Sequence, residues 1–589
     1  MDSSPSPPQY VPETRVYSYS NRNLSNEHAD IDEKKPAVVE QSEVSVGEVD
    51  IVQPKGWFSD FVDGFRLANT DDGTPEHGLK RKLKSRHIQM IAIGGAIGTG
   101  VWVGSGQSLA TGGAASVLIN YILVGTMVFF TVYNLGELCV AFPTRGGYIT
   151  HATRFIDDSW GFALSWNYVM GPIASIPLEL TTSTMVMRYW TDLNAGIWVT
   201  IFIFFLISAN TFGVRLYGEL EYFLSTIKIA AMFGFIILGI IINCGGVPTD
   251  HRGYIGTHLF RENAFRNGFK GFCSVFTTAA FSFSGTEYVG VAAAETDNPA
   301  KAFPKAVRQT FFRIAIFYIF SLLIVGLLVS GADPRLTSYS GVDASPFVLA
   351  IKDANIKALP SILNAVILIS VISSANATLY AGSRAIHSLG CNGFAPKCFG
   401  WVDRSGRPII ALLILFFFMP LAYLVETGKS TTVFNWLLSI SSLGTLFTWG
   451  SINLAYIRYR SAMKHQQRSV KQIGFRSPFG IYAAWYAFGF ICLVLVAEFY
   501  VSVSPISGKS SANSFFMNYL SAIIILVFFV VHKLIYRTPI ITSSSMDIET
   551  DLACVVPSEK DQEKLETTGF GSLQNAIKKM LFFLKTYFP

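Results

Sequence analysis

Apolar residues in this chain gather in long blocks, and short polar segments separate each block from the next. A block of about 20 predominantly apolar residues, coiled into a helix, matches the thickness of the hydrocarbon core of a bilayer. Twelve blocks of this length can be counted, so the pattern predicts an all-α polytopic membrane protein. The predicted spans run at about 88–108, 114–140, 160–187, 195–213, 221–244, 272–295, 312–332, 359–387, 408–426, 432–457, 481–503 and 515–536.

The composition agrees with this class. Of the 589 residues, 50% are hydrophobic and only 15% are charged, against about 25% charged in an ordinary soluble domain. Residues 1–85 are instead polar and rich in Ser and Pro, without the apolar core of a signal peptide, so they are predicted to form a disordered cytosolic tail. Residues 86–537 are predicted to hold the twelve helices. Residues 538–589 would be a cytosolic C-terminal tail that ends in an amphipathic helical period.

The positive charges predict how the spans are oriented. Most Lys and Arg residues fall in alternate loops, including the cluster Lys80–Arg86 before the first span and the loop Arg458–Arg476. The positive-inside rule places these loops and both termini in the cytosol. The first cluster could also form a nucleic-acid patch, but its position beside a span favours a topology signal, and we expect no nucleic-acid partner.

Two of the spans contain residues that interrupt helices. The segment Met90–Gln107, MIAIGGAIGTGVWVGSGQ, has six glycines, and each costs about 1 kcal/mol relative to Ala inside a helix. The sixth span reads AAFSFSGTEYVG and places Gly285 and Glu287 at membrane depth. Such glycines serve either close helix packing or an unwound segment, and their spacing alone leaves both readings open.

The two interrupted spans are the first and the sixth, which predicts a five-plus-five inverted repeat. The halves would cover about 88–244 and 272–457, with peripheral helices at about 481–536. Unwinding would free backbone N–H donors at Ala96–Gly100 and carbonyl acceptors at Phe281–Ser284. Donors suit a carboxylate and acceptors suit an ammonium group, so together they fit a zwitterionic amino acid.

Five motifs, in order along the chain, carry a family resemblance. GGAIGTG, FPTRGGYITHATRFID, FSFSGTEYVG with AAAETDNPAKAFPKA, SSANATLYAGSR and VDRSGRP resemble those of fungal plasma-membrane amino-acid permeases, of the general or neutral type, in the amino acid–polyamine–organocation superfamily. The resemblance covers about residues 80 to 550. It implies a leucine-transporter-type fold, with ten core helices and two peripheral ones, and proton-coupled uptake of amino acids by alternating access.

The resemblance also implies which residues bind the substrate. A turn of backbone donors would hold the substrate carboxylate, and its residues are Gly98, Thr99 and Gly100. Backbone carbonyls of both breaks would hold the amino group, and these belong to Ala96, Phe281 and Ser284, with Ser282 between the last two. Phe283 would lie over the substrate as a lid or wall. Ser284 stands where permeases for basic amino acids tend to carry Gln, which favours a neutral or broad substrate range.

Ionisable residues at membrane depth are costly and are functional candidates. Glu179, in SIPLELTTS of the third span, is predicted to set specificity; alternatively its carboxyl bonds to a neighbouring helix. Lys228, in STIKIAAMF of the fifth span, matches by resemblance the position that couples proton-driven relatives to their gradient; alternatively it snorkels to the interface. Glu287 is a second candidate for proton coupling. Glu295, at the inner end of the sixth span, is expected to be solvated.

The two tails suggest regulation. Lys34 and Lys35, in IDEKKP, resemble the N-terminal lysines that ubiquitin-ligase machinery modifies in this family. The stretch Met546–Asp551, MDIETD, resembles the acidic signal that the secretory-pathway coat reads when such permeases leave the endoplasmic reticulum. Ubiquitin ligases and coat proteins are therefore the expected protein partners.

Other classes of function fit the sequence less well. No Gly-x-Ser-x-Gly, phosphate-binding loop or HExxH motif appears, so neither an enzyme nor a cofactor or metal ion is expected. The paired breaks and the lack of a filter-like repeat argue against a channel. An amino-acid sensor built on a permease fold, and a permease for basic amino acids or a related derivative, stay open as alternatives.

Overall fold

The apolar blocks of the sequence fold into helices, and no β-strand occurs among the described residues. The computed structural model describes residues 86–87, 89–90, 97–144, 147–212, 214–295, 299–337, 345–427, 430–468, 475–506, 511–550 and 552, all within one compact unit that begins at Phe58. The prediction of an all-α protein is confirmed. Lys34, Lys35, Ala96 and the amphipathic end of the chain lie outside the described residues.

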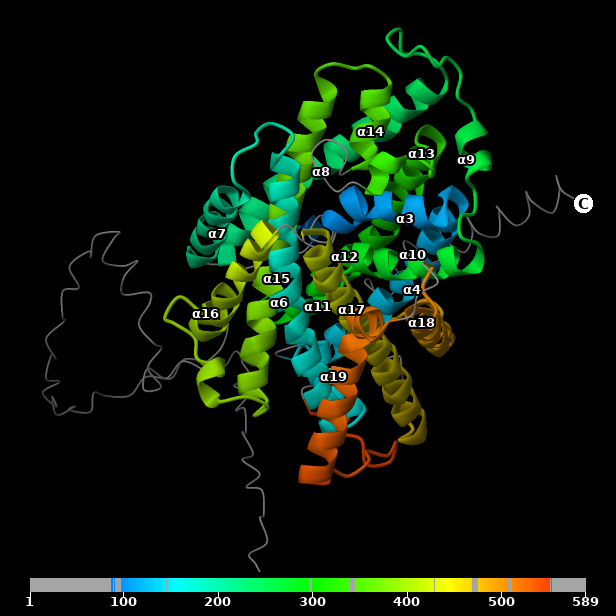
Figure 1. Cartoon of the computed structure of the whole chain (residues 1–589). Coiled ribbons are helices and arrows are strands. Elements are labelled where there is room, and N and C mark those ends of the chain that lie inside the picture. Colours follow the sequence, from blue (N-terminus) through cyan, green and yellow to red (C-terminus); the bar gives the residue numbers. More distant parts are fainter. Residues whose placement is uncertain are drawn as a thin grey trace, which may run out of the picture. The chain divides into compact units, whose positions relative to one another are not determined.

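Figure 1 shows long continuous helices beside short and interrupted ones. The long helices are α4 (Ala114–Ala141), α6 (Asp158–Met187), α8 (Val214–Asn243), α15 (Leu359–Cys391), α17 (Ser430–His465), α18 (Gly480–Val503) and α19 (Ala512–Tyr536). The interrupted segments are η1 (Gly100–Gly104) with α3 (Ser105–Gly112), and α10 (Gly268–Phe283) with α11 (Tyr288–Val291) and η2 (Ala292–Glu295). Two further helices change type without a gap, and these are α12 (Pro299–Arg313) with η3 (Ile314–Phe320) and α13 (Ser321–Leu328), and α16 (Ile409–Phe418) with η7 (Met419–Thr427). The shorter elements are α5 (Tyr148–Phe155), α7 (Ala195–Thr211), α9 (His258–Glu262), η4 (Pro334–Thr337), α14 (Pro346–Asp353) and η6 (Lys397–Gly400).

Seven helical stretches of the described part are long and apolar enough to cross a membrane, and these are Ala114–Ala141, Leu216–Asn243, Phe303–Leu328, Leu359–Cys391, Ile409–Glu426, Gly480–Val503 and Asn518–Tyr536. This is fewer than the twelve predicted spans, for physical reasons. The first and sixth spans are divided by their breaks into pieces shorter than a bilayer requires, and α7 has only 17 residues. Helices α6 and α17 are long enough, but their many Ser, Thr and Asn residues make them too polar to count as apolar spans. Within the described residues, helical segments occupy all twelve predicted ranges, but the count of twelve spans stays a prediction.

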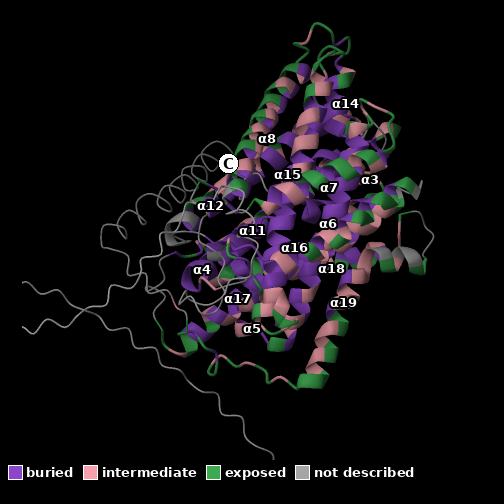
Figure 2. Cartoon of the chain, turned by 90° about the vertical axis from the view of Figure 1, so that its left-hand side faces the viewer, coloured by how far each residue is buried: buried purple, intermediate pink, exposed green. Residues whose placement is uncertain are grey.

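Helix α6 lies at the centre of the helical packing, where it contacts α15 and α17. Figure 2 shows buried residues concentrated along these helices. Large apolar side chains are instead exposed on α8, as at Phe223 (63% exposed) and Ile237 (60%), and on α19, as at Leu534 (71%). Exposed apolar surface on this scale is typical of helices that contact lipid.

The first part of the expected C-terminal tail packs against the helices. Met546 and Ile548 are buried, and Arg154 of α5 donates a hydrogen bond of 2.8 Å to the carbonyl of Asp547. Gln466, just after α17, donates one of 2.8 Å to the carbonyl of Met546. The acidic stretch that begins at Met546 is therefore joined to α5 and to the end of α17.

Candidate functional site

The glycines of the first break allow three elements to approach one another closely. A Cβ atom added at Gly98 would lie 2.5 Å from Ser374 Oγ of α15 and 2.9 Å from Glu179 Oε1 of α6. A Cβ atom added at Gly100 would lie 2.6 Å from the backbone of Ser282 on α10. The segment is also not a plain α-helix, because Gly98 is a bend and residues from Gly100 form the π-helix η1. Both readings of the glycines, close packing and an interrupted helix, therefore hold.

The second break separates α10 from α11. Helix α10 ends at Phe283, Ser284 is extended, and Gly285 has a φ of +89°, a conformation that glycine adopts without strain. The Ser284 amide still donates to the carbonyl of Phe281, at 3.0 Å. Helix α11 begins four turn residues later, at Tyr288. The prediction that the sixth segment is interrupted at Gly285 agrees with this geometry.

Glu179 joins the first break to two long helices. Its side chain is buried in the middle of α6. Thr99 Oγ1 donates a hydrogen bond of 2.6 Å to Oε2, and Ser374 Oγ donates one of 3.0 Å to Oε1. Each carboxyl oxygen thus has one hydroxyl partner from a different element. In the described part of the chain, no three His, Cys, Asp or Glu residues are placed to bind a metal ion.

A small cavity of about 20 Å³ lies beside Glu179. Five of the residues predicted to bind substrate line it, and these are Gly98, Gly100, Glu179, Phe281 and Ser284. The sequence reasoning missed its other lining residues, Ser175, Tyr288, Ser374 and Thr378. A signal for most of them was present, because Ser175 with Glu179 and Ser374 with Thr378 are polar pairs spaced by four residues, which share one face of a helix.

Ser282 and Phe283 do not line this cavity. The ring of Phe283 stacks on Tyr318 with 4.1 Å between centroids, and it is fully buried. Ser282 Oγ is 2.7 Å from the hydroxyl of Tyr121, and Tyr318 donates a hydrogen bond of 2.8 Å to the carbonyl of Ser282. These two residues therefore anchor α10 to α4 and η3, while Phe281 and Tyr288 are the aromatic residues that line the cavity.

Lys228 belongs to a buried polar cluster on α8. It is completely buried, so it does not snorkel to the interface, and its Nζ lies 3.8 Å from Glu221 Oε1. Glu221 is also completely buried and accepts hydrogen bonds from Ser373 Oγ at 2.7 Å and from Ser225 Oγ at 3.1 Å. Glu221 was not predicted as a functional residue. Ser373 precedes Ser374 on α15, so the cluster around Lys228 and the cavity at Glu179 share this helix.

Glu287 is held by neutral donors. Its Oε1 accepts a hydrogen bond of 3.2 Å from the Gly285 amide, and its Oε2 accepts one of 3.1 Å from Trp449 Nε1 of α17. The buried guanidinium of Arg313 donates to the hydroxyl of the neighbouring Thr286. Glu287 therefore fixes the turn between α10 and α11, and the residues that line the cavity do not include it.

Beyond the second break lies a buried ion pair. Arg384 Nε of α15 lies 2.8 Å from Glu295 Oε1, and Tyr380 donates a hydrogen bond of 3.0 Å to Oε2. Tyr380 also stacks on Tyr217 of α8 with 4.3 Å between centroids. The expectation that Glu295 is solvated is wrong: it is completely buried, because α15 supplies a cation that the linear sequence does not place beside it.

Breaking this ion pair should destabilise the protein more than removing both of its charges. Arg384→Met leaves Glu295 charged and buried without its cation, which is expected to cost roughly 3 kcal/mol or more of unfolding free energy. The double variant Arg384→Met with Glu295→Gln should recover much of that loss. Thermal unfolding of the purified protein in detergent measures both. Equal destabilisation by the two variants would contradict the pairing.

Comparisons with known proteins agree with these observations. The amino acid permease family model matches residues 87–543. An uncharacterized amino-acid permease of Schizosaccharomyces pombe is 71% identical over 91% of this chain and 92% of its own length. Cationic amino acid transporter 1 of the same organism is 51% identical over 95% of this chain and 96% of its own length. Amino-acid permease GAP3 of Candida albicans is 46% identical over 80% of this chain and 79% of its own length.

The matched region contains both breaks, Glu179 and Lys228, together with the seven helices of the described residues that are long and apolar enough to cross a membrane. The chain therefore belongs to the amino acid permease family of the amino acid–polyamine–organocation superfamily, as do its fungal relatives, and it is a multi-pass membrane protein that transports amino acids rather than an enzyme.

Proposed function

We propose that the protein is a proton–amino-acid symporter of the plasma membrane, with twelve spans, a leucine-transporter-type inverted repeat and cytosolic termini. The observation that carries the proposal is the hydrogen-bonded Glu179, which joins the interrupted first segment to α6 and α15 at the wall of a cavity. A buried carboxyl at such a junction supplies a charged group where two broken segments meet. Interrupted helices in a membrane protein point to a substrate site at the repeat interface.

The substrate would lie between the two breaks. Its carboxylate would meet the backbone donors of Gly98, Thr99 and Gly100. Its ammonium group would meet the carbonyl groups of Ala96, Phe281 and Ser284, and its side chain would extend toward Glu179. The cavity of about 20 Å³ holds little more than a water molecule. Binding of an amino acid therefore requires its walls to separate, and Phe281 is the wall residue that can rotate away from the cavity without breaking a polar contact.

The substrate range is inferred to be neutral or broad. Ser284 is small and places its hydroxyl 3.1 Å from that of Thr445, which leaves the side-chain end of the cavity polar and uncharged apart from Glu179. A relative named as a cationic amino acid transporter is 51% identical, so a permease for basic amino acids is the second candidate. In that case Glu179 would pair with the cationic side chain of the substrate.

Proton coupling would run through Lys228. Its ammonium group lies in the buried cluster with Glu221, which leads through Ser373 and Ser374 of α15 to Glu179. A proton that moves across this cluster changes the charge beside the substrate site, and each inward proton contributes about 2.3 kcal/mol per 100 mV of membrane potential. Glu287, which the turn holds with neutral donors, is a second group that can take up a proton.

The proposed regulation concerns the tails. Ubiquitin-ligase machinery would modify Lys34 and Lys35, and the secretory-pathway coat would read the acidic stretch from Met546. A sensor that binds amino acids without accumulating them is the alternative to transport, and surface-expressed protein without uptake would favour it.

Filling the cavity with one methyl group should abolish uptake. In Gly98→Ala the added Cβ would lie 2.5 Å from Ser374 Oγ, so the turn must shift and the site at Glu179 is lost. Gly234→Ala on α8 is the matched control, because nothing lies within 4 Å of its added Cβ. Uptake of radiolabelled amino acids, at equal surface abundance, should fall at least tenfold in the first variant and stay normal in the second. Normal uptake by Gly98→Ala would place the substrate elsewhere.

Removing the charge of Lys228 should separate transport from the proton gradient. Lys228→Met is expected to retain amino-acid exchange but to lose accumulation, and the ratio of uptake at pH 5 to uptake at pH 7.5 should fall to about one. Lys464→Met, which removes an exposed lysine at the end of α17, serves as the control and should keep the pH dependence of the unmodified protein. Accumulation that still follows pH in Lys228→Met would rule out this residue as the coupling group.

A further inference from the structure

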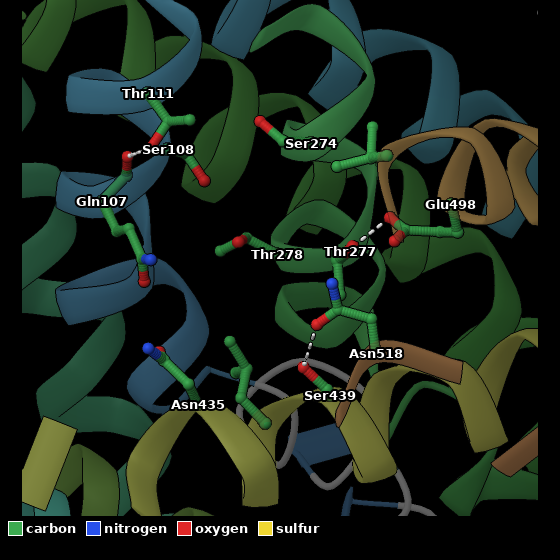
Figure 3. Close-up of a pocket in the computed structure, with 12 residues that line it drawn as sticks. Gln107, Ser108, Thr111, Ser274, Thr277, Thr278, Asn435, Ser439, Glu498 and Asn518 are labelled. Carbon is green, nitrogen blue, oxygen red and sulfur yellow. Dashed lines mark hydrogen bonds between the residues drawn. The ribbon is translucent and has the colours of Figure 1, made fainter. Parts of the chain in front are cut away.

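A second and larger pocket lies apart from the cavity at Glu179. Its volume is about 210 Å³, and Figure 3 shows the side chains that line it. The lining comes from α3, from the C-terminal end of α18, from the N-terminal ends of α17 and α19, and from the middle of α10. Because successive spans run in opposite directions, these ends lie at the same face of the membrane. With cytosolic termini, as proposed above, that face is the outer one.

Ten of the twelve residues that line the pocket have polar side chains. Gln107 and Asn435 extend their amides toward the same space in Figure 3. Ser108 also lines the pocket, and its buried hydroxyl has no hydrogen-bond partner among the described residues. A buried hydroxyl without a partner loses the hydrogen bond that it makes in water, so a ligand that supplies one is favoured.

The pocket also contains a buried carboxyl group that pairs with no cation in the described part of the chain. Glu498 of α18 is 4% exposed, and the hydroxyl of Thr277 donates a hydrogen bond to it. No Lys, Arg or His of the described residues forms an ion pair with Glu498, and Lys270 of α10 bonds instead to the hydroxyl of Ser504. A buried carboxylate with one neutral partner is costly, and a ligand with an ammonium group relieves that cost.

We propose that this pocket is a vestibule site that binds the amino-acid substrate before it reaches Glu179, with its ammonium group at Glu498; the inference rests on the transport function proposed above. The volume suits a small amino acid, whereas the cavity at Glu179 does not in this conformation. The hydroxyl of Ser108 and the amides of Gln107 and Asn435 are donors for the substrate carboxylate. In a basic amino acid, the cationic side chain would be a second group able to pair with Glu498.

One apolar layer separates the vestibule site from the cavity. Leu438 lines the vestibule site, Phe281 lines the cavity, and both belong to a buried cluster with Phe434. A substrate in the vestibule site therefore reaches Glu179 only when Phe281 and Leu438 part. The substrate would therefore bind at two separate sites in turn, and Glu498 would affect its affinity only at the vestibule site.

Glu498→Gln should weaken capture of the substrate without changing its passage. It removes the charge and keeps the shape, so the KM for uptake should rise about tenfold, as expected for one charge-assisted hydrogen bond, while Vmax stays unchanged. Glu262→Gln, an exposed acid on α9 at the same face, is the matched control and should leave KM unchanged. Glu498→Asp should recover part of the affinity. An unchanged KM in Glu498→Gln, or an equal rise in the control, would overturn the proposal.

Chemical labelling tests the vestibule site independently of transport. Ser439 lines the pocket. The double variant Ser439→Cys with Gly98→Ala places a reactive thiol in the vestibule site while the substrate site at Glu179 is blocked. A membrane-impermeant thiol reagent added outside should modify this cysteine, an amino acid should slow the reaction, and Glu498→Gln should remove that protection. Labelling that an amino acid does not slow would overturn the vestibule site even if the unmodified protein transports normally. Failure of the proposed function would appear instead as no uptake by the unmodified protein.

Discussion

A carboxyl group buried in the middle of a membrane protein needs hydrogen-bond donors to offset its loss of contact with water. The donors around Glu179 determine how three elements meet. Thr99 comes from the first interrupted segment and Ser374 from α15, and both donate to the carboxyl that α6 carries. These bonds require the first segment to approach within a distance that any side chain at Gly98 would block. The glycines, the break and the carboxyl therefore depend on one another.

The same constraint connects binding to conformational change. The central cavity is too small for an amino acid, and the apolar residues Phe281 and Leu438 lie between it and the vestibule site. The buried Arg384–Glu295 ion pair lies beyond the second break. In the proposed mechanism these two sets of contacts would be the two gates, one apolar and one charged. A structure built in this way can open one side while the other stays closed, which is what alternating access requires.

Much of the site could be predicted from the sequence because its chemistry is local. Glycines inside an apolar run and the acid at Glu179 stand out by composition, and five predicted residues line one cavity. What could not be predicted depends on which helices are neighbours. The sequence does not show that Phe283 packs on Tyr318 while Phe281 faces the cavity, that Arg384 reaches Glu295, or that Ser373 bonds to Glu221. Glu498 was missed for the same reason, because its pocket is assembled from five separate elements.

Uptake of radiolabelled amino acids by cells that lack their own permeases, at pH 5 and pH 7.5 and with or without an uncoupler, tests the central claim most directly. A proton-driven permease should accumulate amino acids above their external concentration, more strongly at pH 5, and the uncoupler should abolish the accumulation. We also expect Glu179→Gln, at equal surface abundance, to change which amino acids compete for uptake. Surface-expressed protein that accumulates no amino acid, or accumulation that the uncoupler leaves intact, would contradict a proton-driven permease with its substrate site at Glu179.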